Sequence, residues 1–237
     1  MKNIKKNRAI IMLIICILLV AVFFIQFHER KKIESEISSV LNHEVYKLTH
    51  TIVDKYNISN KILETNTVTL GQAEKLERYA GDFRYYCRYL CRVGYETGEY
   101  EYSIFKNSMY ETMDGIELFI YNLIDEYNEG ERLKDNDILI KLDSDLNAAF
   151  NYINDLYWKW LCAINLENNV VSTNSRPIKR TDSIISTEFE YYEEYYKNIA
   201  FKDDRWIDMI NALQYETDEF LKEFTPQMEA LNESLLN

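Results

Sequence analysis

The sequence predicts an all-α protein: an N-terminal transmembrane helix followed by an elongated antiparallel bundle of about five long helices with coiled-coil-like packing. Residues 9–25 contain no polar side chain, which is typical of a membrane span. Beyond them, apolar residues recur at spacings of three and four, a period that predicts amphipathic helices with left-handed packing. The chain of 237 residues contains six glycines and two prolines, so few turns are available and the helices should be long.

The first element is the apolar helix over residues 9–27. It spans about 28 Å at ~1.5 Å per residue, close to the hydrocarbon thickness of a bilayer, roughly 30 Å. A cleaved signal peptide would have a shorter apolar stretch and small residues at its cleavage site, whereas bulky residues occupy positions 23–25 and 27. We therefore expect a permanent anchor.

The orientation follows from the basic residues on either side of the anchor. Lys2, Lys5, Lys6 and Arg8 precede it, whereas residues 30–32 supply three basic side chains that Glu29 partly offsets. Because basic residues favour the cytoplasmic side, we expect residues 1–8 in the cytoplasm and residues 28–237 outside the cell membrane. A cytoplasmic bundle is the alternative.

The next two helices are predicted on either side of a polar stretch. Residues 33–56 should continue the membrane helix outward, with a break at 57–69 that is rich in Asn, Ser and Thr. Thr69 and Gln72 have the spacing of a capping box and should open the second helix, which ends near Gly94 and Gly98. The expected core positions are Ile33, Ile37, Leu41, Val45, Leu48, Ile52 and Tyr56, then Ala73, Leu76, Ala80, Phe83, Cys87 and Leu90.

Three further helices are predicted over residues 109–127, 139–163 and 185–224, and no segment alternates long enough for a strand. Thr225-Pro226 resembles an N-cap and first-turn proline that would start a short terminal helix. The expected core positions are Met109, Met113, Ile116, Ile120, Leu123 and Tyr127, then Leu139, Leu142, Leu146, Ala149, Ile153, Leu156, Trp160 and Ala163, then Phe189, Tyr192, Tyr196, Ile199, Asp203, Trp206, Ile210, Leu213, Thr217 and Phe220. The charged Asp203 falls on the last of these stripes, where we expect a kink or a locally solvated stretch.

The charge of the chain excludes one class of partner. Seven of the 27 basic residues flank the anchor, which leaves 20 basic against 38 acidic residues in the rest of the chain. Nucleic-acid binding needs clustered Lys and Arg, so we expect no nucleic-acid partner. The hydrophobic content of 47% is nevertheless too high for a disordered domain.

The four cysteines allow several interpretations. Cys16 lies in the anchor, Cys87 and Cys91 are one helical turn apart, and Cys162 lies on another predicted helix. Buried thiols are favoured, and a disulfide from Cys162 to either of the pair is the alternative if the bundle is extracytoplasmic. Two cysteines without a second pair make a poor zinc site, and we expect no metal or other cofactor.

Catalytic motifs are incomplete throughout the chain. His43-Glu44 lacks the second histidine of a zincin helix. The stretch that begins at Asp143 resembles the start of an EF-hand loop but has Ala148 at the glycine position. The sequence therefore predicts a protein that is not an enzyme.

One hypothesis concerns contact with the membrane surface. In an antiparallel bundle, the loop at 168–182 should lie near the bilayer. Tryptophan beside basic residues suits anionic headgroups, although Trp160 and its neighbours could instead belong to the core. The residues that would make this contact are Trp158, Lys159, Arg176, Lys179 and Arg180.

A second hypothesis concerns tyrosines beside carboxylates. On helical spacing, Tyr191, Tyr195, Glu190 and Glu194 fall to one side of the fifth core stripe. Such a surface suits cationic groups and protein contacts, and a similar tyrosine cluster occurs at residues 85–89. The alternative is that these tyrosines are half-exposed packing residues.

Two functional classes follow from these observations. The first is a single-pass binding or interaction module at the cell surface, with residues 9–27 in the lipid bilayer and a protein or peptide partner. The second is a structural or adaptor subunit of a membrane complex, whose core stripes would be completed by another protein or by a second copy in a homo-oligomer.

Overall fold

The computed structural model describes residues 2–97, 108–128, 139–168, 171–172, 186–187 and 205–235. Within these ranges the chain is nearly all helical, as predicted, and five helices pack against one another. The helices are α1 (Lys2–Thr65), α2 (Leu70–Thr97), α3 (Ser108–Asn128), α4 (Ser144–Asn168) and α6 (Arg205–Leu235).

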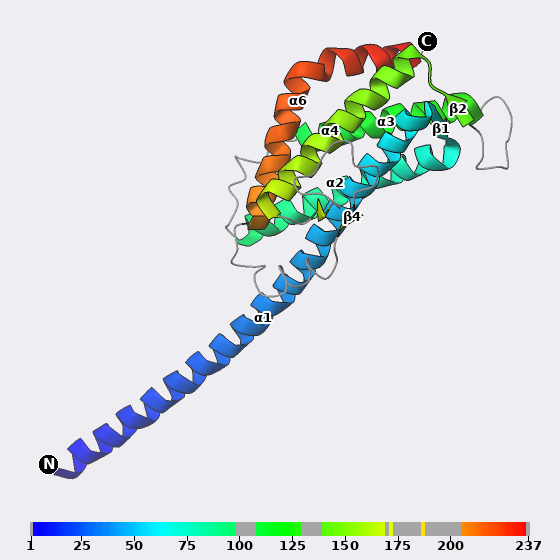
Figure 1. The fold of residues 1–237 in the computed structure, drawn as a ribbon. Helices are drawn as coiled ribbons and strands as arrows, with labels where there is room; N and C mark the ends of the chain where they lie inside the picture. Colours follow the sequence, from blue (N-terminus) through cyan, green and yellow to red (C-terminus); the bar gives the residue numbers. More distant parts are fainter. Residues whose placement is uncertain are drawn as a thin grey trace.

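The main helix contacts form a closed ring. Helix α1 packs against α2 and α4, α3 packs against α2 and α6, and α4 and α6 pack together. Figure 1 shows this bundle at one end of α1, with the N-terminus at the far end. The hydrophobic core therefore lies inside the ring, and the first part of α1 lies outside it.

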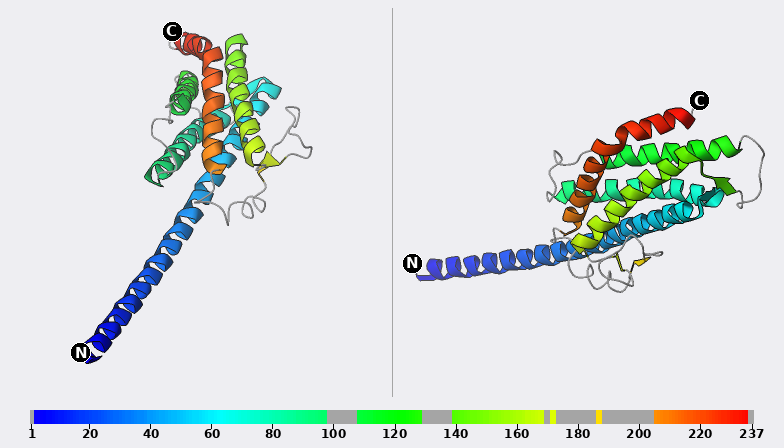
Figure 2. Two further views of the ribbon diagram at one scale, coloured as in Figure 1. Left: turned by 90° about the vertical axis from the view of Figure 1, so that its left-hand side faces the viewer. Right: turned by 45° about the horizontal axis from the view of Figure 1, so that its top comes forward.

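The N-terminal part of α1 extends away from the other helices (Figures 1 and 2). Its apolar side chains are exposed: Met12 is 67% and Ile25 is 60% accessible. Among the described helices, α1 alone is long and apolar enough to cross a membrane, a test that a signal sequence near an N-terminus also passes.

The predicted spacing of apolar residues is confirmed for most of the core. Residues Leu41 to Tyr56 of the α1 stripe are buried, whereas Ile33 is 55% exposed because it precedes the part of α1 that the other helices cover. The buried predicted positions on the other helices are Ala73, Leu76, Ala80, Phe83, Cys87, Leu90, Met109, Met113, Ile116, Ile120, Leu123, Leu146, Ala149, Ile153, Leu156, Trp160, Ala163, Trp206, Ile210, Leu213, Thr217 and Phe220.

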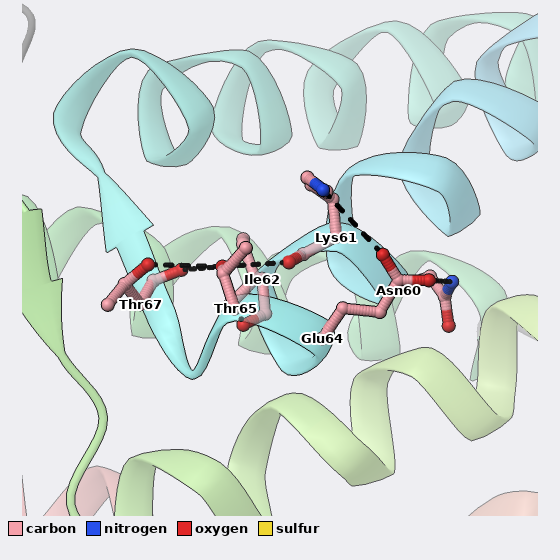
Figure 3. Close-up of polar contacts among 6 residues, drawn as sticks. All are labelled: Asn60, Lys61, Ile62, Glu64, Thr65 and Thr67. Atoms are coloured by element: carbon pink, nitrogen blue, oxygen red, sulfur yellow. Dashed lines mark hydrogen bonds and ion pairs between the residues drawn. The ribbon is translucent and has the colours of Figure 1, made fainter. Parts of the chain in front are cut away.

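The predicted break at 57–69 is largely wrong, because α1 continues to Thr65. Figure 3 shows the polar side chains that form hydrogen bonds at the end of α1. Thr65 Oγ1 donates to the carbonyl oxygen of Lys61 at 2.9 Å. Asn66 follows with a positive φ of 51°, the left-handed conformation that commonly ends a helix, and its N–H donates to Leu63 O. Asn and Thr therefore cap this helix rather than interrupt it.

The capping box is confirmed. The backbone N–H of Thr69 donates to Gln72 Oε1 at 2.9 Å, and the N–H of Gln72 donates to Thr69 Oγ1 at 3.2 Å. These reciprocal bonds satisfy donors that a helix start otherwise leaves unpaired. The second helix, α2, accordingly begins at Leu70.

Short strands occur where none was predicted. Strand β1 (Thr67–Thr69) pairs antiparallel with β2 (Leu139–Lys141), so Leu139 does not start the fourth helix. Helix α4 begins later because Asp143 is its N-cap: Asp143 Oδ1 accepts from the N–H groups of Asp145 and Leu146 at 3.0 and 2.8 Å. A second pair joins β3 (Val171–Ser172) to β4 (Ser186–Thr187).

The last helix also differs from the prediction at both ends. Residues 186–187 are in β4, within the range expected to be helical, and the described part of the last helix begins at Arg205. At the other end, α6 continues through Thr225 and Pro226 to Leu235 instead of restarting there. Figure 1 shows that α6 bends along its length, which is the usual effect of a proline within a helix.

Candidate functional site

Most of the predicted site residues lie outside the described residues. These are the tyrosine and glutamate set, Glu190, Tyr191, Glu194 and Tyr195, and the basic residues Arg176, Lys179 and Arg180. Their roles in binding and in membrane contact stay predictions.

The predicted tryptophan region is described, and it belongs partly to the core. Trp160 is fully buried, its ring stacks on Phe83 at 4.4 Å, and its Nε1 donates to Thr217 Oγ1 at 3.0 Å. Trp158 is partly buried, with its ring centroid 5.5 Å from that of Tyr56 on α1, and Lys159 is half-buried. Trp160 is therefore a packing residue, and membrane contact by Trp158 and Lys159 stays a prediction.

The tyrosines of α2 form a real cluster. The Tyr85 ring stacks against Tyr89 at 6.4 Å and meets the Tyr86 ring edge-on at 5.5 Å. Tyr85 is 59% exposed, whereas Tyr86 and Tyr89 also pack against the core. Cations already lie over two of these rings: Lys47 Nζ is 5.7 Å from the Tyr86 centroid, and Arg92 Cζ is 5.5 Å from that of Tyr89. We call residues 85, 86 and 89 the tyrosine cluster.

A buried carboxylate, Glu44 of α1, affects the pKa of two tyrosines of the cluster through its charge. Burial raises the pKa of Tyr89, and the negative charge of Glu44 is the next cause; the pKa of Tyr86 is raised by burial, by Asp82 and by Glu44. Glu44 is only 8% exposed, and its Oε2 is buried without a hydrogen-bond partner. Glu44 is not among the site residues that the sequence predicts, although it stands three residues after Leu41 and four before Leu48, within the core stripe.

A lysine lies inside the core. Lys55 is completely buried, and its Nζ is 4.5, 5.5 and 5.9 Å from the ring centroids of Phe83, Tyr157 and Trp160. Nζ donates to Met113 Sδ at 3.0 Å, and thioether sulfur is a weak acceptor. Desolvation by burial lowers the pKa of Lys55 well below its usual value, despite the opposing effects of Cys87, Asp82 and Glu117.

No disulfide joins Cys87, Cys91 and Cys162; the side chains of the first two are buried and that of the third is half-buried. Burial raises the pKa of Cys87 and of Cys91, which disfavours the reactive thiolate. Within the described ranges, no group of three or more His, Cys, Asp and Glu side chains is arranged to hold a metal ion. The two α2 thiols therefore act as small core residues, as the favoured interpretation of the sequence had it.

Comparison with known proteins adds no assignment: no family model matches the chain, and no significant match was found among curated proteins or solved structures. The functional argument therefore rests on the chain's own geometry.

Proposed function

We propose that this chain is a single-pass, membrane-anchored helical bundle that acts as a non-enzymatic binding or interaction module at the cell surface. One observation carries the proposal: the apolar run at 9–27 and the core stripe at 41–62 belong to one continuous helix, α1. The run leaves the bundle without covering it, so its described side chains, from Met12 onward, stay exposed.

Exposure of this run to water is strongly unfavourable. Burial of a large apolar side chain is worth roughly 1.5–3 kcal/mol, and nearly every described side chain from Met12 to Phe27 is apolar and at least 47% exposed. A bilayer removes this cost because the helix hydrogen-bonds its own backbone and is long enough to cross. Lipid is therefore the environment that fits the run.

The spacing along α1 sets the height of the bundle. Fourteen residues separate Phe27 from Leu41, the first buried core residue, and they correspond to about 21 Å of helix. A bundle held at that distance from the hydrocarbon core presents its sides to soluble partners. The predicted partner is a protein or peptide, and the proposed orientation places residues 1–8 in the cytoplasm.

The proposal includes an antiparallel, coiled-coil-like arrangement of the helices. The contacts of α1, and of Asn66 just after it, with α4 support this arrangement. Tyr56 contacts Trp158, Ser59 contacts Asn154 and Asn66 contacts Asn147, so residue numbers rise along α1 as they fall along α4. Heptad spacing on α1 supports it as well, because the buried residues include Leu41, Leu48, Lys55 and Ile62.

The test is protease treatment of intact, wall-stripped cells that express the chain with a C-terminal epitope tag. Loss of the tag, with a cytoplasmic control protein intact, is the expected result. Protection of the tag until the membrane is opened would overturn the extracytoplasmic placement. The bundle would then be a cytoplasmic structural or adaptor subunit anchored by the same helix.

A further inference from the structure

The outward side of α3 exposes two large hydrophobic side chains. Leu118 is 50% and Tyr121 is 53% accessible to solvent, and they lie one helical turn apart. On the described parts of α2, α3, α4 and α6, no other two exposed large hydrophobic residues lie within one turn of each other. The buried side chains of α3 lie on the opposite side of the helix, which packs against α2 and α6; they include Met113, Ile116, Phe119, Ile120 and Leu123. Leu118 and Tyr121 therefore form an apolar centre that the bundle leaves uncovered.

Carboxylates stand at both ends of this apolar centre. Glu111 and Asp125 are exposed and lie seven residues before and after Leu118, so the three residues share one side of α3. The ion pairs found among the described residues include neither Glu111 nor Asp125. Asp114 lies on the same side and is paired with Arg84 of α2. The outward side of α3 thus presents acidic, apolar and acidic side chains in turn over about 21 Å of helix.

Gly115 opens the same side of α3 to close approach by another chain. Among the described residues, a β-carbon at Gly115 would meet nothing within 4 Å apart from the adjoining residues and the backbone of its own helix. Packing inside this chain therefore does not require glycine there, although glycine inside a helix is less favourable than alanine. A glycine also lets a second backbone come close. Gly115 stands three residues before Leu118, so the open position borders the apolar centre.

We propose that this side of α3 binds a basic amphipathic helix of a partner protein. We call residues 111, 114, 115, 118, 121 and 125 the α3 surface. An apolar side chain of the partner packs against Leu118 and Tyr121, and a lysine or arginine about two turns to either side of it pairs with Glu111 or Asp125. Tyrosine is enriched among interface hot spots, and the net charge of −12 attracts a basic partner. This inference rests on the proposed binding function and names the kind of partner.

The charges of the α3 surface disfavour a second copy of this chain as its occupant. An antiparallel pairing of two copies about Leu118 would place Glu111 of one chain opposite Asp125 of the other, and a parallel pairing would place each carboxylate opposite itself. Like charges across an interface are unfavourable. Anionic lipid headgroups are disfavoured for the same reason. A basic helix removes this repulsion, and it fits in either chain direction because the two carboxylates are equally spaced from Leu118.

The test is binding of a fluorescent helical peptide to the full-length protein in micelles of a zwitterionic detergent, measured by fluorescence anisotropy. The peptide has a central leucine and a lysine seven residues to either side, and the control peptide has glutamate in place of both lysines. We expect saturable binding of the lysine peptide that weakens as the salt concentration rises, because exposed charges are screened. The glutamate peptide should bind at least about 10-fold more weakly.

Matched variants separate the parts of the α3 surface. Leu118→Ala should weaken binding at least about 10-fold, whereas Ile33→Ala, a similarly exposed residue of α1 outside the bundle, should leave it within about twofold. Asp125→Lys should weaken binding about 5-fold at low salt, and Glu36→Lys, an exposed carboxylate of α1, is its control. Gly115→Gln should weaken binding at least about 10-fold by blocking close approach. Its Tm should not fall, since glutamine is the better helix former.

Several results would overturn the inference: no saturable binding, equal binding of the two peptides, equal binding to empty micelles, or unchanged binding by Leu118→Ala. Unchanged binding by Gly115→Gln would refute the close approach of the partner helix. Because that variant should keep its Tm, its loss of binding cannot be assigned to unfolding. These measurements use purified protein, so a failure here is distinct from a cytoplasmic location found by protease treatment.

Discussion

Replacing Lys55 by methionine should stabilise the bundle, and the gain should grow as the pH falls. Methionine has a similar length and no charge, so it can fill the space between Phe83, Tyr157 and Trp160 with little repacking. The charged form of Lys55 would gain a weak bond to Met113 Sδ and cation–π contacts worth about 2 kcal/mol or more. Burial of an ammonium costs several kcal/mol, so desolvation dominates.

The pH dependence follows from the lowered pKa of Lys55. Below its ordinary pKa near 10.5 the lysine of the unfolded chain is protonated, whereas the buried lysine stays neutral until the pH reaches its lower folded-state value. In that window the unfolded state binds one more proton, so the free energy of unfolding falls by up to about 1.4 kcal/mol for each unit of pH decrease. Asp82, Glu117 and Cys87 favour the charged lysine and Arg84 opposes it, but desolvation is the largest cause.

The assay is urea unfolding of the full chain in detergent micelles, followed by tryptophan fluorescence between pH 7 and pH 10. The difference between wild type and Lys55→Met cancels the other titrating groups and should widen toward pH 7. Lys61→Met is the matched control, because Lys61 lies on the same helix but is exposed. A difference that does not change with pH, or one that Lys61→Met reproduces, would refute the assignment of a neutral buried lysine.

Three other predictions concern the described part of the bundle. Asp143→Ala removes both N-cap bonds of α4 and should cost about 1 kcal/mol, measured by chemical unfolding, whereas no loss would refute the capping role. Ser59 Oγ donates to Asn154 Oδ1 at 2.7 Å in the core, so Ser59→Ala should lower the free energy of unfolding by about 1–3 kcal/mol. A double-mutant cycle with Asn154→Ala should show coupling between the two residues, and additive effects would contradict the hydrogen bond. In the folded protein, alkylation followed by mass spectrometry should label Cys162 faster than Cys87, and equal rates would contradict the burial of Cys87.

The sequence predicts the apolar core well because one physical rule governs it: side chains three and four residues apart share a helix face. The capping box of Thr69 and Gln72 is equally predictable from the sequence, because its two residues lie only three positions apart. The pairing of Thr67 with Lys141 cannot be predicted in this way, because strands of three residues are too short to show a periodic pattern and the two strands are far apart in the sequence. The same limit explains why Leu139 was assigned to a helix.

The candidate site was harder to predict because its polar residues occupy positions expected to be apolar. Lys55 stands seven residues after Leu48 and seven before Ile62, and Glu44 stands between Leu41 and Leu48. A pattern defined by apolar residues alone does not include Lys55 or Glu44, although their positions in the heptad repeat indicate that they are buried. A polar residue inside a long apolar stripe is thus the signal that could have revealed each of them.

These polar residues also bear on how the sequence specifies one packing arrangement. A charged or polar residue in a core stripe lowers stability but can fix the register of neighbouring helices. In this bundle, one register of α1 against α4 pairs Ser59 with Asn154, and the packing of α1 against α2 places Lys55 over Phe83. A shift of α1 by one turn would separate Ser59 from Asn154 in the core and move Lys55 away from its aromatic neighbours. Because the anchor is the same helix, fixing the register of α1 also fixes the height of the bundle above the proposed membrane.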